Sequence, residues 1–239
     1  MLKVDSISAG YGKLQILTDV SLEAPPGELT VIVGPNGSGK STLLKSIAGL
    51  TTLYKGTVTM DEKVLSGHPP YLIARSGLAY LPQTDSVFTK LTVTENFKMA
   101  AYIVSKSDYE SRLRDSLEIF PQLKGYLDSK VVNLSGGERQ MVAMSMALLR
   151  KPRVIMFDEP TANLSPKYAT QVLNTIRALG KDRGLTIVLV EQNAKRALEI
   201  GDRAYLLVGG KNAFIGTAKE LLSHQELAKM YLGMKAAGA

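Results

Sequence analysis

The chain has 239 residues, 45% of them hydrophobic and 21% charged, which is the ordinary balance of a globular protein with a buried core. It contains no cysteine, so disulfides and thiolate metal sites are excluded. The formal net charge is +7, but Lys and Arg are scattered, so nucleic acid is only a minor alternative as a partner. The apolar runs fall short of the roughly 20 residues that cross a bilayer, and the first ten residues do not resemble a secretory signal. We expect a soluble chain that reaches a membrane only through a partner.

Residues 2–33 alternate short β-like stretches with turns. The last of these stretches, residues 29–33, is an apolar strand that leads directly into a glycine-rich loop. A helix is expected to follow from Lys40 to about Leu50, and residues 55–67 predict a β-hairpin. The opening part of the chain therefore predicts a β-rich region around one loop and one helix.

The middle of the chain has a helical pattern. Residues 92–104 and 107–120 carry apolar side chains at i, i+3 and i+4 spacing, and Pro121 should end the second of these helices. A Gly-Gly turn then leads into a further apolar helix that ends near Leu149. We interpret this stretch as a helical insertion.

Strand-like and helical segments alternate again at residues 153–159, 185–192 and 203–216. This alternation predicts an α/β fold with a mostly parallel sheet and helices on its faces. An antiparallel β subdomain would precede that core, and an α-helical subdomain would be inserted into it. We expect a single domain over residues 1–239, with the core and β subdomain in residues 1–90 and 152–216, the helical subdomain in residues 91–151 and a helical tail in residues 217–239.

The segment from Gly34 to Ser41 has the P-loop pattern G-x-x-x-x-G-K-S, between a strand and a helix. Glycine lets the chain curl until several N–H groups point inward, and the following helix adds its positive N-terminal end. Lys40 should reach the β- and γ-phosphates of a nucleotide, and Ser41 should bind Mg²⁺. A chance glycine-rich turn is the alternative, and the flanking strand and helix argue against it. The other nucleotide contacts in this P-loop NTPase core are expected from Asn36, Gly37, Ser38, Gly39 and Thr42.

An apolar strand delivers Asp158 and Glu159 to the carboxyl edge of the sheet, where open α/β folds bind their ligands. Asp158 would hold the Mg²⁺ shell, partly through water, and Glu159 would polarise the attacking water. Acidic residues often end strands, so this pair becomes informative only together with the phosphate loop.

The sequence Leu134-Ser-Gly-Gly-Glu138 lies between the helical insertion and the acidic strand. Together with the two other motifs it resembles the signature of the ABC ATPases, and the resemblance extends over nearly the whole chain. In that family the Ser hydroxyl and Gly amides of this motif bind the γ-phosphate held by the other subunit. The resemblance therefore implies that Ser135 and Gly137 act in trans. The alternative is a simple helix N-cap at Ser135, which leaves the double glycine unexplained.

The resemblance also implies roles for two residues outside these motifs. Tyr11 matches the aromatic residue that stacks on adenine, and the alternative is an exposed hairpin tyrosine. Gln83 matches the loop glutamine that touches Mg²⁺ and senses the membrane partner. Val87, Phe88 and Leu91 would line the groove for that partner, or alternatively belong to the subdomain core.

Two positions depart from the family pattern. Ser165 stands where the family often has Asp. Gln192 stands where the family usually has a switch His, and the two histidines, His68 and His224, lie far from any motif in the sequence. Gln192 is interpreted as a catalytic replacement for that His, or alternatively as a solvent-facing residue in a degenerate site.

The segment Val190-Glu-Gln-Asn193 and the Tyr-Leu-Gly at residues 231–233 resemble the ATP-binding subunits of branched-chain amino-acid importers. That resemblance implies an ATPase that pairs with itself or with a paralogous ATP-binding subunit. It also implies two membrane permease subunits and a substrate-binding protein that acts through the permease. The location would be the cytoplasmic face of the cell membrane.

Three alternatives stay open. The first is another ABC system, for urea or short-amide import or for lipopolysaccharide-type export. The second is a non-transport ABC ATPase acting on nucleic acid, although the chain lacks the long coiled coil or second cassette of such proteins. The third is a small-molecule P-loop kinase, which would need an acceptor pocket and would not need the signature; phosphate release without a phosphorylated product would separate it from an ATPase.

Overall fold

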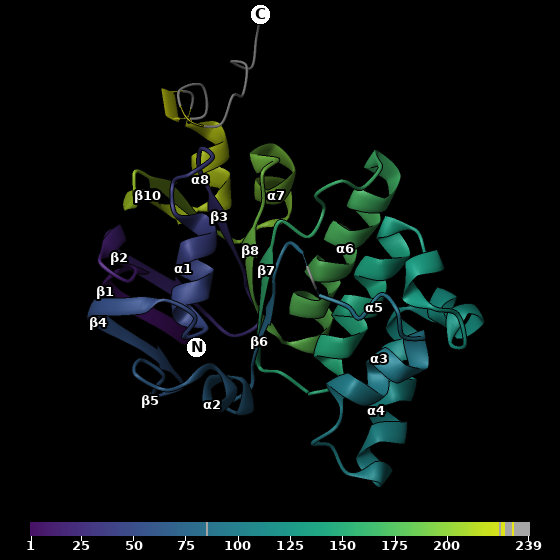
Figure 1. Cartoon of the computed structure of the whole chain (residues 1–239). Helices are drawn as coiled ribbons and strands as arrows, with labels where there is room; N and C mark the ends of the chain where they lie inside the picture. The colour runs from purple at the N-terminus through teal and green to yellow at the C-terminus, as the bar shows by residue number, and fades with distance from the viewer. Residues whose placement is uncertain (85, 225, 228–230, 232–239) are drawn as a thin grey trace, which may run out of the picture.

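The computed structural model describes residues 1–84, 86–224, 226–227 and 231. An antiparallel N-terminal sheet lies beside a larger main sheet, with a helix between them (Figure 1). The N-terminal sheet has the strand order β2-β1-β4-β5, and its β4–β5 pair is the hairpin that the sequence predicted. Its strands are β1 (Leu2–Tyr11), β2 (Leu14–Ala24), β4 (Thr52–Met60) and β5 (Lys63–Val64).

The main sheet has the strand order β10-β9-β3-β8-β7-β6 and is parallel except for the pairing of β10 with β9. Every residue of β3, β7 and β8 is buried, as expected for parallel strands that are covered on both faces. The strands are β3 (Leu29–Val33), β6 (Leu78–Leu81), β7 (Val154–Asp158), β8 (Thr186–Val190), β9 (Arg203–Val208) and β10 (Lys211–Thr217).

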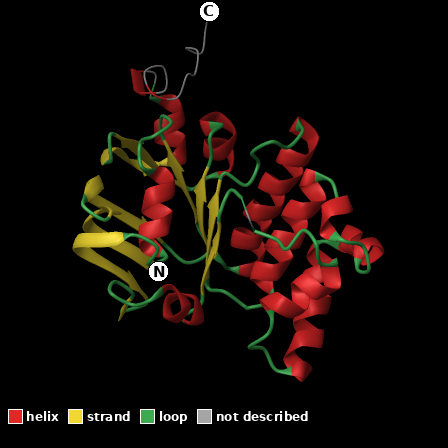
Figure 2. Ribbon diagram, viewed as in Figure 1, coloured by secondary structure: helices red, strands yellow, loops and turns green. Residues whose placement is uncertain are grey.

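Helices cover both faces of the main sheet (Figure 2). Helix α1 lies between the two sheets, whereas α3 to α6 gather on the opposite side of the main sheet (Figure 1). The helices are α1 (Lys40–Ile47), α2 (Pro70–Arg75), α3 (Val93–Ala100), α4 (Lys106–Ile119), α5 (Gly136–Leu148), α6 (Pro166–Arg183), α7 (Ala194–Ile200) and α8 (Ala218–Ser223).

The main sheet separates two hydrophobic cores. Alternate residues of a strand point to opposite faces, and β8 shows the division clearly. Ile187 and Leu189 join the core under the helices, while Val188 and Val190 join the core shared with α1 and the N-terminal sheet. The α/β class, the antiparallel β subdomain and the helical segments are therefore confirmed.

Two helix ends differ from the sequence prediction and one agrees. Helix α1 ends at Ile47 rather than near Leu50, because Gly49 takes a φ of 73° directly after the C-cap. Pro121 does end a helix, since α4 stops at Ile119 and a 3₁₀ turn follows. Helix α8 is shorter than the expected tail, much of which, including residues 228–230 and 232–239, lies outside the described residues.

Over the described part of the chain, no helix combines the length and apolarity that a membrane span requires.

Candidate functional site

The glycine-rich loop connects the buried strand β3 to α1, as the sequence predicted. Gly34, Gly37 and Gly39 have positive φ values of 148°, 76° and 99°, which other residue types rarely adopt. A Cβ on Gly34 would lie 2.1 Å from the carbonyl oxygen of Leu207. Asn36 is exposed at the tip of the loop. The loop therefore curls into a cradle that depends on glycine.

The polar groups of this loop fit a phosphate. Lys40 is only 5% exposed and donates to two carbonyl oxygens of the loop, both at 3.0 Å, which leaves one of its three donors for a ligand. Burial lowers the pKa of Lys40, and the charges of Glu159 and Asp158 oppose that shift. The Ser38 hydroxyl is buried without a hydrogen-bond partner among the described residues. A buried cation and an unpartnered hydroxyl in this cradle match what a bound phosphate group requires.

Asp158 ends β7 and is 4% exposed, with both carboxylate oxygens engaged. Ser41 Oγ donates to Oδ1 at 2.9 Å, and the hydroxyl of Tyr80 donates to Oδ2 at 3.0 Å. Thr42, the next residue of α1, is buried. A hydroxyl and one carboxylate suit Mg²⁺, which uses few protein ligands and completes its shell with waters and substrate phosphates. The described residues hold no cluster of three or more His, Cys, Asp or Glu side chains that could bind a metal.

Glu159 follows β7 with a φ of 49°, a conformation that is strained for a residue with a side chain. Its backbone N–H donates to the carbonyl oxygen of Val190 at 2.9 Å, which ties this turn to the end of β8. Gln83 Nε2 donates to Glu159 Oε2 at 3.1 Å. The structure thus brings together the predicted loop glutamine and the predicted base, although 76 positions separate them in the sequence.

Glu191 is a buried acid that the sequence analysis did not select. It is 3% exposed, and its carboxylate accepts the N–H groups of Thr161 at 3.1 Å and of Gln192 at 3.2 Å. Burial raises the pKa of Glu191, the hydrogen bonds partly offset that shift, and the charge of Glu159 adds to it. The sequence did contain a signal for Glu191, because this acidic residue follows an apolar strand, which is the pattern that singled out Asp158. The side chain of Gln192 itself is exposed at the end of β8.

Ser135 is the N-cap of α5, so the helix-capping role that was the alternative for its hydroxyl is confirmed. The backbone N–H of Ser135 donates to Glu138 Oε2 at 2.7 Å, and the N–H of Glu138 donates back to Ser135 Oγ at 3.4 Å. The double glycine has a packing role as well, because a Cβ on Gly137 would lie 2.7 Å from Cδ1 of Tyr168. Helix α5 lies on the other side of the main sheet from α1 (Figure 1). The helix that begins at Ser135 and Gly137 is therefore separated from the helix of Lys40 within one chain.

Tyr11 ends β1 at the hairpin with β2 and is 44% exposed. Its phenol lies within electrostatic reach of Tyr80 and contributes to the raised pKa of that residue. His68 and His224, which lie far from the motifs in the sequence, are both exposed.

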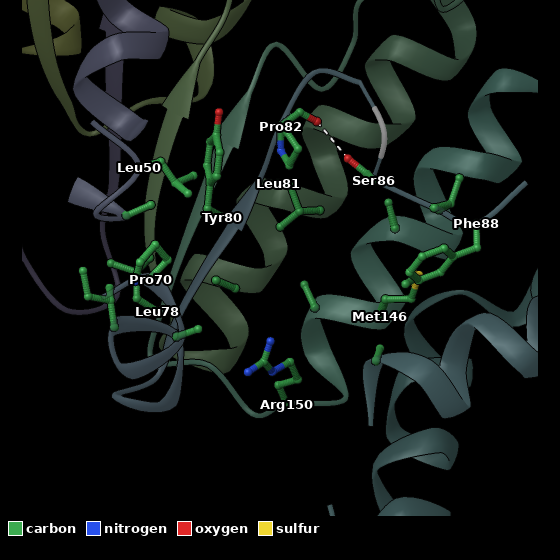
Figure 3. A pocket seen from close by; sticks show the side chains of 18 residues that line it. Leu50, Pro70, Leu78, Tyr80, Leu81, Pro82, Ser86, Phe88, Met146 and Arg150 are labelled. Carbon is green, nitrogen blue, oxygen red and sulfur yellow. Dashed lines mark hydrogen bonds between the residues drawn. The ribbon is translucent and has the colours of Figure 1, made fainter. Parts of the chain in front are cut away.

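A groove lies between β6, the loop after it and α5 (Figure 3). It has a volume of about 400 Å³, and its walls include Tyr80, Val87, Phe88 and Met146. Phe88 is half exposed, while Val87 packs against the core under the helices. Leu91, which was also expected there, is not a wall residue; its backbone instead bonds with Phe88 and Val131. Ser86 Oγ donates to the carbonyl oxygen of Pro82 at 2.8 Å and shapes the loop at the rim.

Residues 17–162, more than half of the chain, match the family model described as ABC transporter. The chain belongs to the ATPase subunits of ABC transporters. ATP binding follows from this assignment, and the small-molecule kinase alternative is excluded. ABC ATPase subunits dimerise and work with permease subunits.

Individual cassettes resemble the chain over most of its length. It is 51% identical over 98% of its length to a probable branched-chain amino acid transport ATP-binding protein of Archaeoglobus fulgidus, covering 99% of that protein. It is 39% identical to a high-affinity branched-chain amino acid transport ATP-binding protein of Pseudomonas aeruginosa, over 98% of this chain and 100% of that protein. A dimeric cassette bound to ADP and phosphate superposes with a TM-score of 0.79 at 25% identity, over 91% of this chain and 99% of that one.

Proposed function

We propose that the chain binds ATP with Mg²⁺ in the glycine cradle and hydrolyses it there. Lys40 supplies a fixed positive charge to the phosphates, and Ser41, Asp158 and Gln83 hold Mg²⁺ directly or through water. Mg²⁺ would neutralise the charge that develops on the phosphate oxygens. Glu159 polarises the attacking water, and its contact with Gln83 supports a shared catalytic edge. Asn36, Gly37, Ser38, Gly39 and Thr42 complete the phosphate contacts, and Tyr11 stacks on the base.

The working unit is a dimer, made of two copies of the chain or of one copy and a paralogous ATP-binding subunit. Each ATP would lie between the phosphate loop of one subunit and the helix start at Ser135 and Gly137 of the other. The position of α1 and α5 on opposite sides of the main sheet supports this, because it separates the two helices within one chain.

The groove beside Tyr80 is proposed as the docking site for a permease subunit. Its half-exposed Phe88 supports this, as does Gln83, which lies in the loop after β6 and donates to Glu159. A segment that enters the groove would move the loop after β6 and thereby the Gln83–Glu159 contact.

The transported substrate is proposed to be a branched-chain or other hydrophobic amino acid. The observation that carries this is the 51% identity to the Archaeoglobus fulgidus protein over nearly the full length of both chains. The complex would contain two permease subunits and a substrate-binding protein that acts through them, with this chain on the cytoplasmic face of the cell membrane. Another ABC system, for urea or short amides or for lipopolysaccharide-type export, is the alternative.

Deleting the gene and measuring uptake tests this function. Uptake of radiolabelled leucine and valine should fall, and the wild-type gene should restore it while Lys40→Ala should not. Loss of urea uptake with normal leucine uptake would assign the chain to the alternative importer. Normal uptake of all three solutes with a defective cell surface would point to export instead.

A further inference from the structure

Tyr80 is a residue of the site that the sequence analysis did not select. It is the third residue of the four-residue strand β6, in register with Met156 of the neighbouring strand β7. Its hydroxyl crosses to the end of β7 and donates to Asp158 Oδ2 at 3.0 Å. Since Ser41 donates to the other oxygen, both oxygens of the Asp158 carboxylate accept a hydrogen bond.

The ring of Tyr80 is fixed by packing. It packs against the core that the main sheet shares with α1 and the N-terminal sheet, and it also forms part of the groove wall. In Figure 3 the hydroxyl points away from Pro70 and Arg150 at the other end of the groove. An aromatic ring has only two side-chain torsions, so a packed ring aims its hydroxyl with little freedom.

The hydroxyl is a donor throughout the physiological pH range. A phenol hydroxyl, whose ordinary pKa is about 10, keeps its proton at neutral pH and can donate it. A hydrogen bond from a neutral hydroxyl to a buried carboxylate is strong, because the acceptor is charged. The hydrogen bond therefore constrains the direction of the Asp158 carboxylate.

We propose that Tyr80 is the positioning residue that orients Asp158 toward the metal bound with the nucleotide. The inference rests on the proposed function, specifically on Mg²⁺ bound near Ser41 and Asp158. Groups that hydrogen-bond a metal's ligands fix their direction, and losing one typically costs about 10–100-fold in metal affinity. Without the hydroxyl, Oδ2 would lose its donor, and the carboxylate would be held through Oδ1 alone.

The test removes a single oxygen atom with Tyr80→Phe. The affinity of the full chain for a non-hydrolysable ATP analogue is measured by calorimetry, once in EDTA and once with saturating Mn²⁺. The ratio of the two affinities reports how strongly metal and nucleotide binding are coupled, independently of turnover. We expect Tyr80→Phe to lower this ratio by about tenfold or more, with an unchanged affinity in EDTA.

Tyr205→Phe is the matched control. Tyr205 lies on β9 of the same sheet, and its hydroxyl accepts the N–H of Glu23 at 2.8 Å, a contact that joins the two sheets and does not involve Asp158. This variant should melt at a lower temperature and keep the wild-type affinity ratio.

The inference is overturned if Tyr80→Phe keeps the ratio within about twofold of wild type. It is equally overturned if the variant loses affinity to the same extent in EDTA and in Mn²⁺, because that pattern reports a structural defect. A wild-type ratio near one would refute the metal role of Asp158, and this inference with it. A wild-type chain that binds no analogue in either condition would instead refute the proposed ATP site.

Discussion

Glu159 holds a backbone conformation that costs a non-glycine residue about 1–3 kcal/mol, while its side chain meets Gln83. Glutamine keeps the shape of the side chain but cannot take a proton from water. We expect Glu159→Gln to lower ATP turnover by about 10²–10⁴-fold, with ATP still bound at nearly the wild-type affinity. Turnover and nucleotide affinity, measured side by side, check this. If Glu159→Gln turned over ATP at the wild-type rate, Glu159 would not be the base.

Glu191 should make the stability of the protein depend on pH. Its pKa is raised in the folded state from an ordinary value of 4.5, mainly by burial, so folding favours the protonated form. The contribution to stability is complete below pH 4.5 and is lost as the pH rises through the raised folded pKa. We expect wild type to lose stability relative to Glu191→Gln over that rise. Denaturant unfolding of both proteins at several pH values measures the difference, and a constant difference would contradict the prediction.

Gln192 can donate and accept hydrogen bonds but never ionises, unlike the family histidine whose position it is expected to take. If it contacts the γ-phosphate, Gln192→Ala should lower turnover well beyond its effect on ATP affinity. Gln192→His should stay active and gain a new pH dependence near neutrality. A pH–rate profile of the three proteins in the assembled transporter checks both statements. Three superimposable curves would leave Gln192 as a solvent-facing strand end.

At the scale of elements, the start of α5 is packed against α6 through Gly137. A Cβ at this position would lie 2.7 Å from the ring of Tyr168, whereas a Cβ on Gly136 would meet only the end of Leu164, at 3.2 Å. Overpacking of this kind typically costs about 1–3 kcal/mol. We therefore expect Gly137→Ala to lower the free energy of unfolding by that amount, and Gly136→Ala to change it much less. Equal effects of the two substitutions on the free energy of unfolding would show that the close contact between Gly137 and Tyr168 does not exclude a larger side chain.

Elements with strong local signals were predicted from the sequence, and elements defined by distant partners were not. The strand, loop and helix around Lys40 carry their own pattern of glycine and apolar residues. Tyr80 carries no such signal, because its role depends on β6 lying beside β7, a pairing that joins residues more than 70 positions apart. The end of α1 was missed for a different reason: Gly49 can continue a helix or end it, and here its positive φ ends it.

At the scale of the whole molecule, Asp202 joins several elements. Arg177 of α6 donates to its Oδ1 at 2.8 Å, and the N–H of Leu29 at the start of β3 donates to Oδ2 at 2.8 Å. Burial alone would raise the pKa of Asp202, but these hydrogen bonds outweigh it and lower the pKa below 3.8. The stabilisation is therefore present above pH 3.8 and lost as the pH falls through the folded pKa.

Arg177→Met should remove most of this acid sensitivity. The stability gap between wild type and Arg177→Met should be constant near neutrality and close as the pH drops below 3.8. Acid titrations followed by circular dichroism measure it. A gap that persists at the lowest pH would show that Arg177 stabilises the fold through packing of its side-chain stem instead.

Strand β3 is flanked by β8 and β9, and both lie more than 150 positions later in the chain. During synthesis at about 5–20 residues per second, this strand waits on the order of 10–30 seconds before either neighbour has been made. Both of its hydrogen-bonding edges, and the glycine loop attached to it, are without their final partners for that time. A nascent chain of this protein thus has a long interval in which an apolar five-residue segment is open to chaperones or to other nascent chains. Slower translation between residues 34 and 185 should lengthen that interval and increase aggregation, whereas slowing translation after β9 should not.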